Sequence, residues 1–72
     1  MTLDIEDKKA LIELLENHIN EHYKLIKDYQ RVIEHNRKNP NAYKLNRISY
    51  MYTEINKNYT KITQLERIKA NI

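Results

Sequence analysis

The sequence contains no cysteine, no glycine, no tryptophan and no phenylalanine, and it has a single proline. Without cysteine, the chain can form neither disulfides nor thiolate-ligated zinc sites. Without glycine, it lacks the loops that bind phosphate in P-loop and dinucleotide-binding proteins, and a β-rich fold with tight turns is disfavoured. A length of 72 residues allows one domain.

Long hydrophobic runs are also missing. The first residues are acidic rather than basic, and apolar runs there extend over only a few residues. These features argue against a signal peptide and a transmembrane helix, so a cytoplasmic location with no membrane partner is expected. The chain is rich in isoleucine, lysine, asparagine and tyrosine. That bias suggests an AT-rich genome, such as that of a low-GC bacterium, its phages or its plasmids.

The charge is unevenly distributed along the chain. The formal net charge is only +3. Residues 1–22 carry six acidic and two basic side chains, a net of −4, whereas residues 43–72 carry six basic and two acidic side chains, a net of +4. If the chain folds back on itself, its acidic start lies beside its basic end.

Isoleucine recurs at every seventh residue in the first half of the sequence. The repeat comprises Ile5, Ile12, Ile19, Ile26 and Ile33. Such a repeat is typical of a helix that packs with coiled-coil geometry, and it predicts one helix over residues 4–38. Asp4 or Thr2 can cap the start of this helix, and the early acidic residues suit the positive end of its dipole.

The predicted helix is interrupted at Pro40, because proline cannot continue a helix that is already running. Asn39 suits the N-cap of a second helix and Pro40 its first position. We therefore expect a turn at residues 39–41 and a second helix over residues 40–71. A turn this short makes the two helices antiparallel neighbours.

Apolar residues in the second helix follow alternating steps of three and four. They are Leu45, Ile48, Tyr52, Ile55, Tyr59 and Ile62. After Ile62 the pattern continues through Leu65, Ile68 and Ile72, whereas Glu66 and Lys69 occupy the strict seven-residue positions. This irregularity predicts looser packing at the far end of the helix.

The two repeats can be paired about the turn. Residue numbers that sum to 81 pair Ile33 with Ile48, Ile26 with Ile55, Ile19 with Ile62, Tyr29 with Tyr52 and His22 with Tyr59. The repeats were read independently, and they fall into one register. The predicted fold is therefore all-α, a coiled-coil-like antiparallel two-helix hairpin.

One flank of this hairpin is mostly apolar and the other mostly polar. The apolar flank comprises Leu11, His18, Leu25, Val32, Met51, Leu65 and Ile72. A two-helix core is small, so an apolar flank indicates an interface. We expect a homodimer in which two hairpins form a four-helix bundle through this flank. The alternative is a monomer that docks the same flank on a different protein.

The stretch "HINEH" matches H-x-x-E-H, the signature of the inverted-motif zinc peptidases, at His18, Glu21 and His22. Such an enzyme also needs a third ligand and a substrate cleft, which two helices without long loops do not offer. The heptad places His22 in the seam facing Tyr59, His18 on the apolar flank and Glu21 in water. A noncatalytic metal site formed by His18, His22 and Glu66 is the alternative. We expect no metal, cofactor or catalytic site.

A stripe of basic residues and tyrosines follows the outer face of the second helix. It comprises Tyr43, Arg47, Tyr50, Lys57 and Lys61. Such a stripe suits phosphate or an acidic partner, although an ordinary solvated face is the simpler interpretation. The sequence predicts a non-enzymatic interaction protein, a regulator or inhibitor of phage or mobile-element origin that binds a host protein. The alternative is a nucleic-acid-associated accessory protein that uses this stripe.

Overall fold

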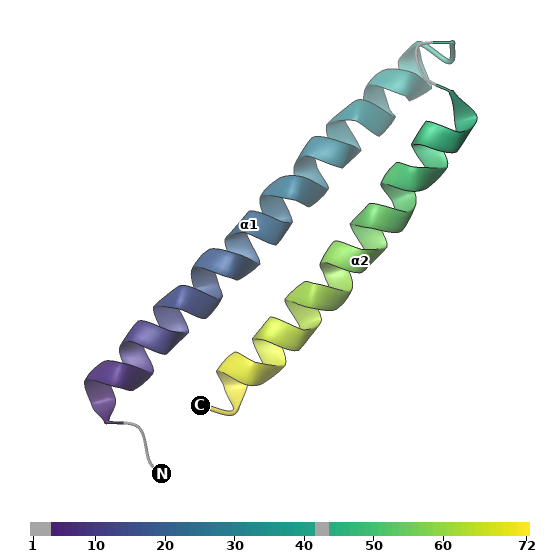
Figure 1. The fold of residues 1–72 in the computed structure, drawn as a ribbon. Helices are drawn as coiled ribbons and strands as arrows, with labels where there is room; N and C mark the ends of the chain where they lie inside the picture. The colour runs from purple at the N-terminus through teal and green to yellow at the C-terminus, as the bar shows by residue number, and fades with distance from the viewer. Residues whose placement is uncertain (1–3, 42–43) are drawn as a thin grey trace.

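Two antiparallel helices make up the described part of the chain. The structure, a computed structural model, describes residues 4–41 and 44–72. Helix α1 spans Ile5–Lys38 and helix α2 spans Leu45–Ala70. The helices lie side by side, with both termini at one end of the hairpin and the connection at the other (Figure 1). The predicted all-α helical hairpin is confirmed.

Helix α1 begins at a side-chain cap. The carboxylate of Asp4 accepts a hydrogen bond of 2.8 Å from the backbone N–H of Asp7, which has no partner inside the helix. Glu6 and Asp7 place negative charge in the first turn, where the helix dipole is positive. The predicted cap at Asp4 is therefore confirmed. Thr2, the other candidate cap, lies outside the described residues.

The connection between the helices is longer than predicted. Asn39 is the C-cap of α1: its backbone N–H donates to the carbonyl groups of His35 and Asn36, and its side-chain amide also donates to the His35 carbonyl. Helix α2 begins only after Lys44, which provides no side-chain cap. The prediction that Asn39 and Pro40 start the second helix is wrong, because Asn39 instead serves the open carbonyl groups at the end of α1.

The core follows the predicted register. Ile19 and Ile26 of α1 form one buried cluster with Ile55 and Ile62 of α2. Tyr29, Ile33 and Leu65 are partly buried against this cluster. Two pairs that the sum of 81 places opposite each other, Ile19 with Ile62 and Ile26 with Ile55, thus occupy the same core. Burial of apolar surface in this seam is the main force that holds the hairpin together.

Helix α2 turns a different side toward α1 than the sequence predicts. Tyr52 and Tyr59 are 54% and 44% exposed, whereas Met51 and Asn58 are buried. The predicted pairs of Tyr29 with Tyr52 and of His22 with Tyr59 are therefore wrong. Each misplaced tyrosine directly follows the residue that is buried in its place. The phenol rings lie at the edge of the seam, where their hydroxyl groups stay in reach of water.

The buried positions of α2 advance in regular steps of three and four. They are Ile48, Met51, Ile55, Asn58 and Ile62, followed by the half-buried Leu65 and Lys69. Ile72, just beyond the end of α2, is also half-buried. The predicted irregularity after Ile62 is therefore absent. Lys69 fits this series because its aliphatic stem covers the seam while its ammonium group lies 3.7 Å from the Glu16 carboxylate of α1.

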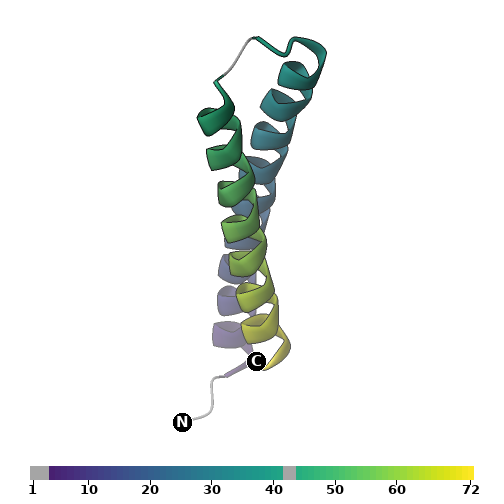
Figure 2. The same cartoon turned by 90° about the vertical axis from the view of Figure 1, so that its right-hand side faces the viewer.

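The hairpin is a long, single layer of two helices. Its dimensions are 55 × 14 × 12 Å, and the side view in Figure 2 shows that, among the described residues, no further element lies over either flank of the pair. Of the described helices, neither is long and apolar enough to cross a membrane. Both flanks of the seam are consequently open to solvent.

Candidate interaction face

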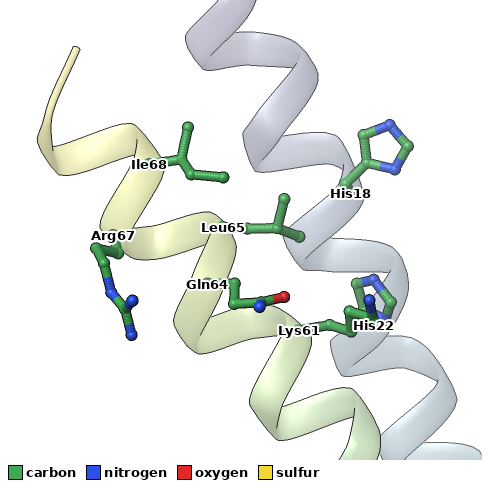
Figure 3. Close-up of a pocket in the computed structure, with 7 residues that line it drawn as sticks. All are labelled: His18, His22, Lys61, Gln64, Leu65, Arg67 and Ile68. Carbon is green, nitrogen blue, oxygen red and sulfur yellow. The ribbon is translucent and has the colours of Figure 1, made fainter.

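An open groove of about 510 Å³ runs between the helices in the half of the hairpin that holds the termini. Its lining residues are His18 and His22 of α1 and Lys61, Gln64, Leu65, Arg67 and Ile68 of α2, shown in Figure 3. The groove exists because two helices without a third neighbour leave a furrow beside their seam. It lies on the predicted apolar flank.

His22, which lines the groove and is half-buried, forms a polar pair with the buried Asn58. The Nδ1 of His22 lies 2.7 Å from the Oδ1 of Asn58, and the Nδ2 of Asn58 donates a 2.7 Å hydrogen bond to the backbone carbonyl of Glu54. Since an amide oxygen only accepts, this arrangement places a proton on Nδ1 of His22. Asn58 is only 7% exposed, and both ends of its amide group have partners.

His18 lies one turn before His22 and faces solvent. Its Nδ1 is 3.9 Å from a carboxylate oxygen of Glu21, and its side chain is 53% exposed. Glu66, the third ligand of the alternative metal site, lines a different groove and pairs with Lys69 at 3.7 Å. Within residues 4–41 and 44–72, no three potential ligands among histidine and the acidic residues come together. The expected absence of metal and of catalysis stays a prediction.

Exposed apolar side chains surround the groove. Ile68 in its lining is 50% exposed, and Leu14 and Leu25 are 53% and 45% exposed. Leu14 precedes His18 by four residues and Leu25 follows it by seven, so helical geometry places all three on one side of α1. We call the groove together with Leu14 and Leu25 the groove face.

The groove face carries positive charge but no acidic group in its lining. Lys61 and Arg67 contribute cations, and Gln64 and the two imidazoles add hydrogen-bonding groups. Leu65 and Ile68 supply the apolar part. The combination suits a helix that presents apolar side chains beside carboxylates.

The residues of the predicted apolar flank differ in how far they are exposed. Met51 is 6% exposed and belongs to the interior of the hairpin. Leu11, Val32, Leu65 and Ile72 are half-buried, and His18 and Leu25 are exposed. The members on α1 are thus largely accessible, whereas those on α2 mainly contact α1. This follows from the side that α2 turns toward its neighbour.

Two residues of the groove face were missing from the predicted flank. Leu14 and Ile68 each lie one helical turn from a residue of that flank, Leu14 before His18 and Ile68 after Leu65. The apolar pattern after Ile62 predicts Ile68 to lie in the seam. The spacing itself was the signal that could have identified both residues.

The predicted basic and aromatic stripe is partly engaged within the chain. Tyr43 lies outside the described residues. A hydrogen bond joins Tyr50 to Tyr29, and burial, followed by the charges of Tyr50 and Glu54, raises the pKa of Tyr29. Lys57 pairs with Glu54 at 3.4 Å, and Lys61 lines the groove. Arg47 is exposed on the surface of α2 and also interacts within the chain. Use of the stripe for nucleic acid stays a prediction.

The opposite flank holds a smaller, polar groove of about 290 Å³. It is lined by Glu16, Ile19, Asn20, Tyr23, Glu66 and Lys69. The ammonium group of Lys69 bridges Glu16 of α1 and Glu66 of α2, at 3.7 Å from each. The charged groups of this flank therefore form ion pairs within the hairpin. The lining of the groove face, in contrast, contains no acidic group.

Comparison with known proteins does not add a function. No family model matches the chain, and neither a curated protein nor a solved structure matches it. The groove face is therefore interpreted from its own residues.

Proposed function

We propose that the chain is a small, non-enzymatic protein-interaction module that pairs with a second copy through its groove face to form a four-helix bundle. The observation that carries this proposal is the exposure of Leu14, Leu25 and Ile68 around one groove. Contiguous apolar surface of this kind marks interfaces in water-soluble folds. Two hairpins that cover each other's groove face give the common architecture for paired helices.

The exposed surface area of the hairpin is large enough for an interface with a second copy. The chain exposes 6041 Å². A compact monomer of 8.8 kDa exposes about 4,800 Å², so the hairpin exposes roughly 1,200 Å² more than its mass requires. A stable interface of standard size buries about 800 Å² on each partner. The excess exposed surface is therefore larger than the area that a standard interface with a second hairpin would bury on each copy.

We further propose that the paired module is a regulator or inhibitor from a phage or mobile element and acts on a host protein. The composition supports an AT-rich source, and the short chain is suited to binding rather than to enclosing a substrate. Pairing through the groove face leaves the outer surfaces of both hairpins available. The host partner would then contact those surfaces.

A double charge substitution on the groove face tests the pairing. Leu14→Glu with Ile68→Glu should convert the dimer into a monomer, because the second copy would bury four unpaired carboxylates. Both side chains are about half exposed in the hairpin, so the helices should persist. Size-exclusion chromatography with light scattering measures the mass, and circular dichroism measures the helix content.

Leu45→Glu is the matched control, since Leu45 is 82% exposed and lies at the start of α2, far from the groove. This variant should remain dimeric. If the double variant keeps the dimer mass, or if the wild-type chain is already monomeric, pairing through the groove face is wrong.

A further inference from the structure

We infer that the two hairpins pair with their loops at the same end of the bundle, so that α1 of one copy lies along α2 of the other. This inference rests on the proposed pairing and adds its orientation. A closed pair of hairpins has two symmetric arrangements. With the loops at the same end, α1 contacts the second copy's α2. With the loops at opposite ends, α1 contacts α1 and α2 contacts α2.

The position of the apolar residues favours the same-end arrangement. Leu14 and Ile68 have numbers that sum to 82, close to the register of 81, so they lie at the same height in the half that holds the termini. A two-fold axis along the bundle then brings Leu14 of each copy to Ile68 of the other. Both apolar patches are covered, and the contact is made twice.

The opposite-end arrangement places Ile68 of one copy against polar groups of the other. When the helices overlap along their full length, each terminal half meets the loop half of the second copy. There the same side of α2 carries Tyr50, hydrogen-bonded to Tyr29, and the ion pair of Glu54 with Lys57. Ile68 would pack on these polar groups, and they would lose water without gaining partners.

Charge gives a second, independent argument. Helix α2 carries five basic and two acidic residues, a net of +3. The opposite-end arrangement sets α2 directly against α2, which brings like charges together. The same-end arrangement separates the two α2 helices across the diagonal of the bundle. It also lays residues 4–22 of α1, with six acidic and two basic side chains, along the α2 half that contains Lys61 and Arg67.

Single spin labels distinguish the two arrangements. The chain has no cysteine, so one introduced cysteine gives one label per copy. Asn41 lies in the connection at the loop end, and its label reports the distance between the two loops. In the same-end dimer this distance should be within about three helix diameters, roughly 30 Å. In the opposite-end dimer it should approach the 55 Å length of the hairpin.

Asn20→Cys is the matched control. Asn20 lies near the middle of α1 and lines the opposite groove, away from the groove face. Its label should give a distance of roughly 30 Å or less in either arrangement, because it is near mid-height in both. Pulsed dipolar spectroscopy on the full chain measures both distances.

The outcomes separate the orientation from the pairing. Short distances for both Asn41→Cys and Asn20→Cys support the same-end dimer. A short distance for Asn20→Cys with a long one for Asn41→Cys overturns the orientation and retains the dimer. Absence of dipolar coupling in both variants overturns the pairing and the orientation together.

A mixed crosslinking experiment provides a second readout. Leu14→Cys and Ile68→Cys chains, oxidised as an equimolar mixture, should form a disulfide between the two variants. Each variant oxidised alone should stay uncrosslinked, since in the same-end dimer neither residue meets its own counterpart. If the oxidised mixture forms no disulfide between the two variants, this arrangement is contradicted, because Leu14 of one copy would then not lie beside Ile68 of the other.

Discussion

Asn58, which is buried, and His22, which is half-buried, make a polar side-chain contact across the seam. Their 2.7 Å contact fixes how α2 is rotated against α1, because Asn58 is also held by the Glu54 carbonyl. A buried polar pair of this kind specifies register at some cost in stability. Residue by residue, it explains why an asparagine is buried while the adjacent Tyr59 is exposed.

Removing one partner of this pair should be more harmful than removing both. Asn58→Ala leaves the Nδ1–H of His22 without its acceptor, and it should lower the free energy of unfolding by about 1–3 kcal/mol. The double variant His22→Leu with Asn58→Leu should be close to the wild type or more stable, since no polar group is left unpaired. Urea unfolding followed by circular dichroism measures both. A double variant that is less stable than Asn58→Ala would contradict this prediction, because it would show that the pair raises the free energy of unfolding relative to two leucines.

The two helices differ in how they begin. Helix α1 has the Asp4 cap, whereas Lys44 before α2 makes no side-chain cap and places a cation near the positive end of the helix dipole. The start of α2 is therefore the weaker of the two N-termini. Its first residue, Leu45, is 82% exposed and adds little packing.

Substitution at the two caps should change stability in opposite directions. Asp4→Ala should lower the free energy of unfolding by about 1 kcal/mol, because the N–H of Asp7 loses its acceptor. Lys44→Asp should raise it by a similar amount, roughly 1 kcal/mol, by adding the missing cap and reversing the charge. Thermal unfolding at a single protein concentration compares the two. Equal effects of the same sign would contradict this description of the helix starts.

The sequence was sufficient to predict α1 but not the rotation of α2. The isoleucine repeat of α1 has no competing pattern, so the burial of Ile19 and Ile26 and their register with Ile55 and Ile62 could be predicted. Ile5, the first residue of the repeat, is nevertheless 73% exposed. In α2, Met51 is followed by Tyr52 and Asn58 by Tyr59. In the second pair, hydrophobicity alone favours burial of Tyr59 over Asn58. The preference for Asn58 depends on His22, which is 36 residues away in the chain, so no local pattern contains it.

For the groove face too, the sequence places residues of α1 correctly and misplaces residues of α2. His18 and Leu25 follow the α1 repeat and are exposed, as a flank residue should be. The sequence predicts Met51 on the flank and Ile68 in the seam because it does not determine the rotation of α2. Correct placement of one helix and incorrect placement of the other is the expected result when only one of them carries an unambiguous repeat.

At the scale of the whole molecule, the hairpin is too thin to cover its own apolar surface. Two helices enclose one seam, and a small core of this kind contributes only about 3–5 kcal/mol. The radius of gyration is 16.7 Å, whereas a compact chain of this length would have about 11 Å. The groove face contains the exposed apolar side chains Leu14, Leu25 and Ile68, and a second copy is the partner that we propose for it.

The dependence of stability on protein concentration tests this central claim most directly. If pairing through the groove face stabilises the fold, the urea midpoint of the wild-type chain should rise steadily as concentration increases over two or three orders of magnitude, because mass action favours the paired, folded state. The Leu14→Glu, Ile68→Glu variant should show a lower midpoint that does not depend on concentration. A wild-type midpoint that stays constant over the whole range would contradict the account, since the hairpin would then be stable without a second copy.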